Sequence, residues 1–231
     1  MTELAASLSL CSGAGTKAAP LFAADCVIVE AAPALVDSEL YPEEREFVAK
    51  AVAKRRAEFG TARLCARQAL SQLGAAAGSL VPAADRSPVW PEGAVGTITH
   101  TAGYCGVAVA HSAQYASLGL DAEQDKLLQP EMIAMICTAA ERSRTRGPDA
   151  IVYFAAKEAF YKCQYPLTRQ FLDFQDVELE LDARLTSFRA RVLKPLPQKP
   201  RWIDQLHGRI LRRDGLVLCG VSLPVAQLRG A

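Results

Sequence analysis

The chain has 231 residues, of which half are hydrophobic and 22% are charged, and its formal net charge is +1. This composition is typical of an ordered globular protein and excludes an intrinsically disordered chain. Because the charges nearly balance, no global field attracts nucleic acid or an anionic membrane surface. No stretch approaches the roughly 20 apolar residues of a membrane-spanning helix, so we expect neither nucleic acid nor a membrane as partner.

The cysteines and histidines give no sign of a zinc site. Seven cysteines are scattered along the chain without a C-x-x-C pair, which indicates reduced, packed thiols. His100, His111 and His207 form neither an H-E-x-x-H helix nor zinc-finger spacing. The N-terminal segment lacks the basic start and the sustained apolar run of a signal peptide. We therefore expect a cytoplasmic protein.

The first part of the chain is predicted to contain a frayed N-terminal segment, a helical region and four strands. Residues 1–20 are predicted to be a frayed lead-in to a strand in DCVIVE. Apolar residues recur with helical spacing from Pro42 to Leu73, and Gly60 is a candidate hinge between two helices. A Gly- and Pro-rich loop follows, and strands are predicted in VGTITH, YCGVAVA and SLGLDAE.

The second part repeats the order of helices followed by strands. Helices are predicted over about 130–142 and 150–164, and strands in QDVELELD and TSFRARVL. A closing hairpin in GRILRRDGLVLCGVSL carries an Asp-Gly turn. This order predicts an α+β fold of two halves, residues 1–116 and 117–231, that meet near residue 116.

Two arginines lie on or beside the apolar face of the first predicted helix. At 100° per residue, Arg55 falls near the middle of the apolar stripe, and Arg63 lies at its edge if the phase survives Gly60. A guanidinium on a buried face is costly unless it is paired or reaches an anion. The two side chains therefore either extend to the rim of the core or form a phosphate clamp.

Two carboxylates are predicted on one side of a strand. In SLGLDAEQ, strand alternation directs Asp121 and Glu123 to the same side. Like charges so close repel each other and are tolerated when a divalent cation lies between them. The pattern fits either an exposed acidic strand end or a metal site.

The segment FAAKEAFYK, residues 154–162, has two distinct faces if it is helical. One is an ordinary core face, made of Val152, Ala156, Ala159, Phe160 and Cys163. The other carries Glu158 and Lys162 among aromatic side chains, with Lys157 beside them. Solvated faces seldom hold so many aromatic residues, which favours a second buried face over a simple surface ion pair.

Four segments resemble the motifs of one enzyme family in both order and spacing. They are VAKRRAEFGTARLCARQAL, SPVWPEGAVGTITHTAGYCGVAVA, SLGLDAEQ and FAAKEAFYKCQYPL. The resemblance is to the surfactin-type, large monomeric class of 4'-phosphopantetheinyl transferases, and within it to the actinobacterial and enterobactin-synthetase-like branch. It covers roughly residues 43–182.

The resemblance implies a pseudo-dimer of two α+β halves, active as a monomer, with its site between the halves. It implies a magnesium-dependent transfer of the phosphopantetheine arm of coenzyme A to a serine of an apo acyl, peptidyl or polyketide carrier domain. Adenosine 3',5'-bisphosphate is the other product. Such enzymes serve fatty acid, polyketide, nonribosomal peptide and siderophore biosynthesis. The N-terminal half would bind the phosphates of coenzyme A, and the C-terminal half would supply the metal site and the catalytic helix.

The resemblance also implies roles for individual residues. Asp121 and Glu123 match the acidic pair that holds Mg²⁺ on the pyrophosphate, with the Ala122 carbonyl as a further ligand. Glu158 matches a helix glutamate that holds the metal or accepts the proton of the serine. Asp121, Glu158 and Lys162 are therefore the expected catalytic residues. The residues expected to contact coenzyme A are Arg55, Arg63, Thr99, His100, Lys157 and Lys162.

The sequence departs from the family pattern at three places. GLDAE and TITH stand where GIDIE and SISH or SLTH are usual, which spares the functional side chains. In the loop before PVWP, close relatives often have a phosphate-binding lysine that is missing here, and Arg86 is the candidate replacement.

Two other functions stay open on the sequence alone. A family member that binds coenzyme A or another nucleotide without turnover is one, although all three carboxylates and Lys162 are present. A nucleic-acid-binding module that uses KRRAEFGTARLCAR is the other, and the balanced charge argues against it.

Overall fold

Residues 8–229 are described in a computed structural model, where they form two antiparallel sheets, each with one long helix packed against it. The strands are β1 Cys11–Ser12, β2 Val27–Ala31, β3 Ala94–Thr101, β4 Tyr104–His111, β5 Tyr115–Gln124, β6 Val177–Leu181, β7 Ser187–Val192, β8 His207–Arg213 and β9 Leu216–Pro224. The helices are α1 Pro42–Val48, α2 Ala53–Leu73, α3 Pro130–Ile136, α4 Ala139–Arg144, α5 Ala150–Thr168 and α6 Val225–Arg229.

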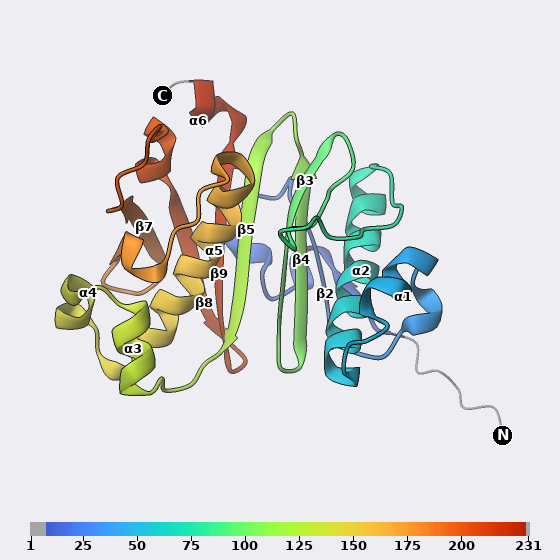
Figure 1. Ribbon diagram of the computed structural model, residues 1–231, viewed down its shortest axis with the longest axis horizontal. Coiled ribbons are helices and arrows are strands. Elements are labelled where there is room, and N and C mark those ends of the chain that lie inside the picture. Colours follow the sequence, from blue (N-terminus) through green and yellow to red (C-terminus); the bar gives the residue numbers. More distant parts are fainter. Residues whose placement is uncertain (1–7, 230–231) are drawn as a thin grey trace.

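The sheets divide the chain into an N-terminal and a C-terminal half. The first sheet has the order β1-β2-β4-β3 and the second the order β5-β9-β8-β7-β6. Helix α2 packs on β2 and β4, and α5 packs on β5 and β9. The strands β3, β4 and β5 lie at the centre of the molecule, with α5 to one side and α2 to the other (Figure 1). The predicted α+β fold of two similar halves is therefore confirmed.

The two sheets meet where the edge strand β3 lies against the edge strand β5. Side chains make this joint, since Thr97 Oγ1 accepts the backbone N–H of Leu120 at 3.0 Å and Thr99 Oγ1 accepts that of Ala122 at 3.1 Å. Strand alternation places both threonines on the same face of β3. Both are buried, so these bonds satisfy donors that would be costly to leave unpaired.

An apolar cluster fills the space behind this joint and includes the segment before β2. Its members from the two halves include Ala18, Leu21, Phe22, Leu118, Leu120 and Leu218. Lys17, in the same segment, forms an ion pair with Asp214 of the β8–β9 turn. The expectation of a frayed lead-in is therefore wrong for residues 8–20, whereas residues 1–7 lie outside the described range.

The first helical region breaks at residues 49–52, between α1 and α2, and not at Gly60. Gly60 lies inside α2, where a Cβ would come within 2.7 Å of a methyl group of Val36, so its role is close packing. The break resets the helical phase, which leaves Arg55 exposed in the first turn of α2. The prediction that Arg55 lies on the buried stripe is wrong, while Arg63 is only 5% exposed.

Each half contains a buried glutamate that starts a short helix and pairs with a cation of the long helix. Glu44 accepts the backbone N–H of Tyr41 before α1, ion-pairs with Arg67 of α2 at 2.9 Å, and accepts the backbone N–H of Leu80. In the second half the corresponding acid is Glu141, at the start of α4. It ion-pairs with Lys157 of α5 at 2.7 Å.

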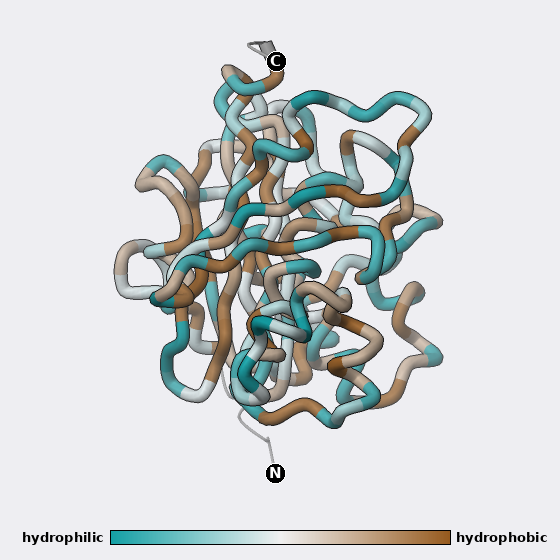
Figure 2. The backbone as a smooth tube through the Cα atoms, turned by 90° about the vertical axis from the view of Figure 1, so that its left-hand side faces the viewer, coloured by the Kyte–Doolittle hydropathy of each residue, from teal (hydrophilic) through white to brown (hydrophobic). Residues whose placement is uncertain are grey.

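The C-terminal half follows its predicted elements, except that the helix predicted over 130–142 is divided into α3 and α4 at Cys137 and Thr138. Seen from the side of this half, hydrophobic and hydrophilic residues alternate along the chain (Figure 2), and β7 shows the same alternation of exposed and buried side chains. The predicted turn between β8 and β9 is present, with Asp214 and Gly215 both at positive φ. Among the described helices, none combines the length and the hydropathy that a bilayer crossing requires.

Helix α5 lies unusually close to β5. A Cβ at Gly119 of β5 would overlap the carbonyl oxygen of Ala159 and would lie 2.9 Å from the backbone nitrogen of Cys163. Because the obstacle is helix backbone, no side-chain rotation relieves it. The core face of α5 is buried as predicted, and its opposite face, with Glu158 and Lys162, is turned toward the N-terminal half.

The first prediction concerns this close approach. Gly119→Ala is expected to lower the free energy of unfolding by about 3 kcal/mol, because α5 must move away from β5. Urea unfolding followed by circular dichroism measures the loss. Gly78→Ala is the control, since a Cβ there meets nothing within 4 Å, and it should stay within about 1 kcal/mol of the parent. Equal stability of the two variants would contradict the proposed contact.

Candidate active site

A cleft of about 730 Å³ lies between the two halves, a size within the range of roughly 300–1,000 Å³ typical of small-molecule sites. Eight of the residues predicted from the sequence line it, namely Arg55, Arg63, Arg86, Thr99, His100, Asp121, Glu158 and Lys162. Glu123 opens instead into a shallow neighbouring groove. Ala122 and Lys157 line neither the cleft nor this groove.

Asp121 lies at the centre of the cleft and is only 4% exposed. Its Oδ1 is 2.7 Å from Lys162 Nζ and accepts the Thr99 hydroxyl at 3.3 Å. Thr99 therefore helps to orient this carboxylate. The second oxygen, Oδ2, is buried and has no hydrogen-bond partner among residues 8–229. It is available to a cation or to a donor brought by a ligand.

The neighbouring carboxylates are perturbed by burial and by Asp121. Burial first, and the Asp121 charge second, raise the pKa of Glu158, which Lys162 partly lowers. The same two causes raise the pKa of Glu123 to about 7, against the opposing charges of Lys162 and Lys126. Glu123 and Glu158, whose ionisation is disfavoured by burial and by the Asp121 charge, form with Asp121 a region where a cation is stabilising.

These carboxylates do not form a closed metal cage. Within residues 8–229, no three His, Cys, Asp or Glu side chains lie close enough together to hold a metal by themselves. Mg²⁺ is commonly held by one or two carboxylates, with waters and substrate phosphates completing its octahedral shell. The unpartnered Oδ2 of Asp121, with Glu158 in the same cleft, fits a magnesium ion shared with a phosphate-bearing ligand.

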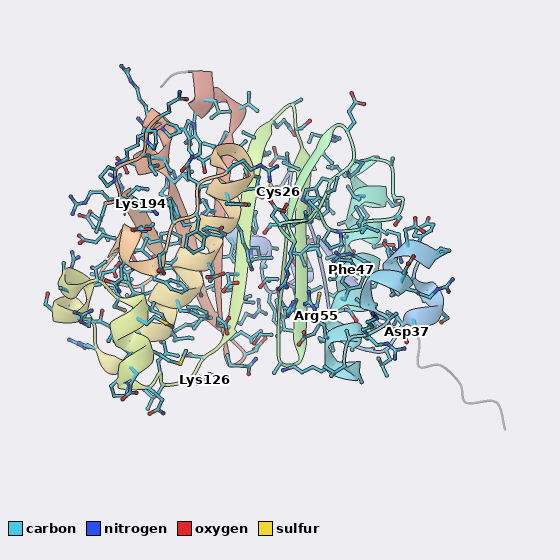
Figure 3. The ribbon with its side chains drawn as sticks, viewed as in Figure 1. Cys26, Asp37, Phe47, Arg55, Lys126 and Lys194 are labelled. Atoms are coloured by element: carbon cyan, nitrogen blue, oxygen red, sulfur yellow. The ribbon has the colours of Figure 1, made fainter. Side chains whose placement is uncertain are left out.

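The N-terminal half lines the opposite wall with cations. Arg55 Nη1 lies 3.0 Å from His100 Nε2, and Figure 3 shows Arg55 beside the central strands with Phe47 above it. Arg63 donates from Nε to the Leu80 carbonyl at 2.8 Å, and its guanidinium carbon lies 3.9 Å from the centre of the Phe59 ring. Burial lowers the pKa of Arg63 to about 10, so it remains charged at neutral pH. This wall therefore suits an anion.

The loop at residues 82–88 closes one end of the cleft and is tied to the C-terminal half. Asp85 Oδ1 accepts the backbone N–H and the hydroxyl of Ser87 at 3.0 and 2.6 Å, and Oδ2 lies 2.9 Å from Arg169 Nη1. These Ser87 bonds, with a smaller contribution from Arg169, lower the pKa of Asp85. Arg86 follows with a φ of 67° and lines the cleft. No local pattern in the sequence indicates Arg169, because its partner is 84 residues away.

Lys157 lies outside the cleft, against the expectation from the resemblance. Its Nζ donates to Glu141 Oε2 at 2.7 Å and to the carbonyls of Ile136 and Phe174 at 2.8 and 2.7 Å. Glu141 is fully buried and also accepts the backbone N–H of Leu179 at 2.7 Å. All three N–H groups of Lys157 are used, so it ties α5 to its own half and has no donor left for a phosphate.

In this cleft between the two halves, an acid–lysine pair faces a basic wall. This arrangement is typical of a site that binds a polyphosphate ligand together with a divalent cation. Comparison with known proteins gives the family. The model for the 4'-phosphopantetheinyl transferase N-terminal domain matches residues 43–110, and that for the 4'-phosphopantetheinyl transferase superfamily matches residues 117–210. The chain belongs to the 4'-phosphopantetheinyl transferase family.

Three relatives are similar over most of their length. The 4'-phosphopantetheinyl transferase Svp of Streptomyces mobaraensis is 42% identical, over 80% of this chain and 79% of the relative. PptT of Mycobacterium tuberculosis is 37% identical, over 79% and 85%. Npt of Nocardia iowensis is 32% identical, over 80% and 90%.

The second prediction tests the structural role of Lys157. Lys157→Met leaves the Glu141 carboxylate buried without its cation, so the free energy of unfolding should fall by about 3–5 kcal/mol. Arg191→Ala, which removes an ion pair whose arginine is 62% exposed, is the control and should cost less than about 1 kcal/mol. Chemical denaturation measures both. If Lys157→Met keeps parental stability but loses affinity for coenzyme A, Lys157 belongs to the binding site after all.

The third prediction follows from the raised pKa of Glu123. The folded value is about 7 against 4.5 for the free side chain, so between these pH values the folded state binds more protons. Stability contributed by this group therefore falls as pH rises from about 4.5 to 7. Glu123→Gln should be more stable than the parent at pH 8 without divalent cations, with a smaller gain at pH 5. Unfolding midpoints at both pH values measure this, and a parent more stable than the variant at pH 8 would contradict it.

Proposed function

We propose that this protein transfers the 4'-phosphopantetheine arm of coenzyme A to a serine of an apo carrier domain and releases adenosine 3',5'-bisphosphate. The observation that carries the proposal is the Asp121–Lys162 pair, which faces a basic wall across the cleft and has one carboxylate oxygen without a partner among residues 8–229. The names of the three relatives support the same activity.

Coenzyme A is held mainly through its phosphates. Arg55, Arg63 and His100 on the N-terminal wall bind them, and guanidinium groups suit phosphate because they form paired, charge-assisted hydrogen bonds. Arg86 takes the place of the missing loop lysine, with Arg169 and Asp85 holding its loop. Lys162 reaches the pyrophosphate from α5 and stabilises the negative charge that accumulates as the bond breaks.

Magnesium is the proposed cofactor, held by Asp121 and Glu158, with Glu123 and the Ala122 carbonyl as further proposed ligands. When bound, it neutralises charge on the pyrophosphate as a Lewis acid. Asp121 is kept in place for this role by Thr99.

Glu158 is the proposed general base. It lies on the cleft face of α5, half-buried, and its raised pKa makes it a better proton acceptor than an ordinary carboxylate. The serine oxygen attacks the phosphorus that carries the pantetheine arm, its proton moves to Glu158, and the phosphoanhydride oxygen leaves with the nucleotide.

The finer identity is also a proposal. We assign the protein to the surfactin-type, actinobacterial and enterobactin-synthetase-like branch. We also propose that it is a cytoplasmic monomer, because the two halves of one chain already form the interface at which the site lies. Acyl, peptidyl and polyketide carrier domains of fatty acid, polyketide, nonribosomal peptide and siderophore biosynthesis are its proposed partners. The alternative is a family member that binds coenzyme A without turnover.

The fourth prediction tests transfer directly. Incubated with coenzyme A, Mg²⁺ and an apo carrier protein, the protein should add the phosphopantetheine arm to the carrier serine, as detected by intact mass. Glu158→Gln should slow transfer by at least about 100-fold, because the base is lost while the fold is kept. Glu180→Gln, at an exposed position of β6, is the matched control.

Two outcomes would count against this proposal. Tight binding of coenzyme A with no adduct on any of several carriers would favour the non-catalytic alternative. Near-parental turnover of Glu158→Gln would remove this residue from the role of base.

A further inference from the structure

One carboxylate lies beside the basic wall, where an anion is expected to bind. Glu58 of α2 has a side chain only 12% exposed, and its Oε2 lies 3.6 Å from His100 Nδ1. It lines the shallow groove together with Arg55 and His100. A carboxylate at this place repels an incoming phosphate. Its other partner, Lys54, is 3.9 Å away and 78% exposed, and such a surface pair stabilises a helix only slightly.

The contacts of His100 determine which of its nitrogens carries the proton. A guanidinium group only donates hydrogen bonds, so His100 Nε2, 3.0 Å from Arg55 Nη1, must be the acceptor. The ring is then neutral, with its proton on Nδ1. That nitrogen faces Glu58.

The surroundings of the ring favour this neutral form. Burial and the charges of Arg55 and Lys162 lower the pKa of His100, whereas Glu58 and Asp121 raise it. Arg55 and Glu58 belong to α2, Asp121 to β5 and Lys162 to α5, and the groove that His100 lines also holds Lys54, Glu123 and Lys126. With the ring neutral, Arg55 on the Nε2 side and Glu58 on the Nδ1 side favour the same tautomer, and the partner on the Nδ1 side also favours the ring orientation that turns Nε2 toward Arg55.

Arg55 depends on the same ring. It lies exposed in the first turn of α2, and its guanidinium is held at the wall of the cleft by the contact with His100. A long, flexible side chain loses conformational entropy when it binds a ligand, and holding it in place beforehand reduces that cost.

We propose that Glu58 is a positioning residue, which fixes His100 with Nδ1–H toward itself and Nε2 toward Arg55, so that Arg55 and His100 are arranged in advance for the phosphates of coenzyme A. The identity of the ligand rests on the proposed function; the arrangement of the three side chains does not. Glu58 itself does not touch the ligand.

The resting protein provides the first test. In ¹⁵N NMR spectra of imidazole nitrogens, the parent should show His100 as the Nδ1–H tautomer, with His100→Asn identifying its signals among the three histidines. Glu58→Met, which keeps the bulk and the helix propensity, should shift these signals toward the other tautomer. Glu58→Gln should restore them, because its amide oxygen is an acceptor that can take the Nδ1–H proton as a hydrogen-bond donor. His111 and His207 should not move in either variant.

Kinetics and binding provide the second test. Glu58→Met should raise the KM for coenzyme A by about three- to tenfold, and should raise the Kd of the coenzyme A complex, measured without a carrier, by the same factor. The kcat should stay within about twofold of the parent. Glu58→Gln should be close to the parent. Glu46→Ala, at an exposed glutamate of α1, is the control for loss of a negative charge from this half.

The outcomes separate this proposal from the proposed function. An Nε2–H tautomer in the parent, or signals unchanged in Glu58→Met, would overturn the positioning role whether or not the protein transfers the arm. A fall in kcat with KM unchanged would overturn it as well, because Glu58 would then act on the chemical step. Failure of transfer in the parent, with the expected NMR result, would reject only the proposed function.

Discussion

The fold and the site both depend on two threonine hydroxyls. Thr97 and Thr99 accept backbone N–H groups of β5, which joins the edge strands of two separate sheets through side chains. Thr99 also donates its hydroxyl proton to Asp121. The contact that holds the halves together therefore also fixes the central carboxylate of the cleft. A relative shift of the two sheets would move Asp121 away from Thr99 and from the basic wall.

Charge is divided between the two halves in a way that explains why the site lies between them. The N-terminal half supplies Arg55, Arg63 and His100, and the C-terminal half supplies the acids and Lys162. Burial and, second, the repulsion from the Asp121 charge raise the pKa values of Glu123 and Glu158. A cation and a phosphate that bind together would relieve this repulsion and satisfy the basic wall at once. A site of this kind is stabilised by its own ligands.

Local patterns in the sequence predicted most of the fold, and they failed where a partner lies far along the chain. Periodicity located the second face of α5, because side chains three and four residues apart share a face. It misplaced Arg55, because the break at residues 49–52 resets the phase that was counted from α1. The resemblance put Lys157 in the site, whereas Glu141, on another helix, holds it in the core. Glu58 and Arg169 gave no signal, since their roles come from contacts across the fold.

The buried glutamates Glu44 and Glu141 occupy equivalent positions in the two halves of the chain. Each starts a short helix, pairs with a cation of the long helix of its half, and accepts one further backbone N–H. The letters around them show no obvious repeat, yet the same arrangement of buried charge occurs twice. This is what the duplication of a single ancestral half would leave: a shared internal scaffold, with the surfaces facing the cleft diverged into one basic and one acidic wall.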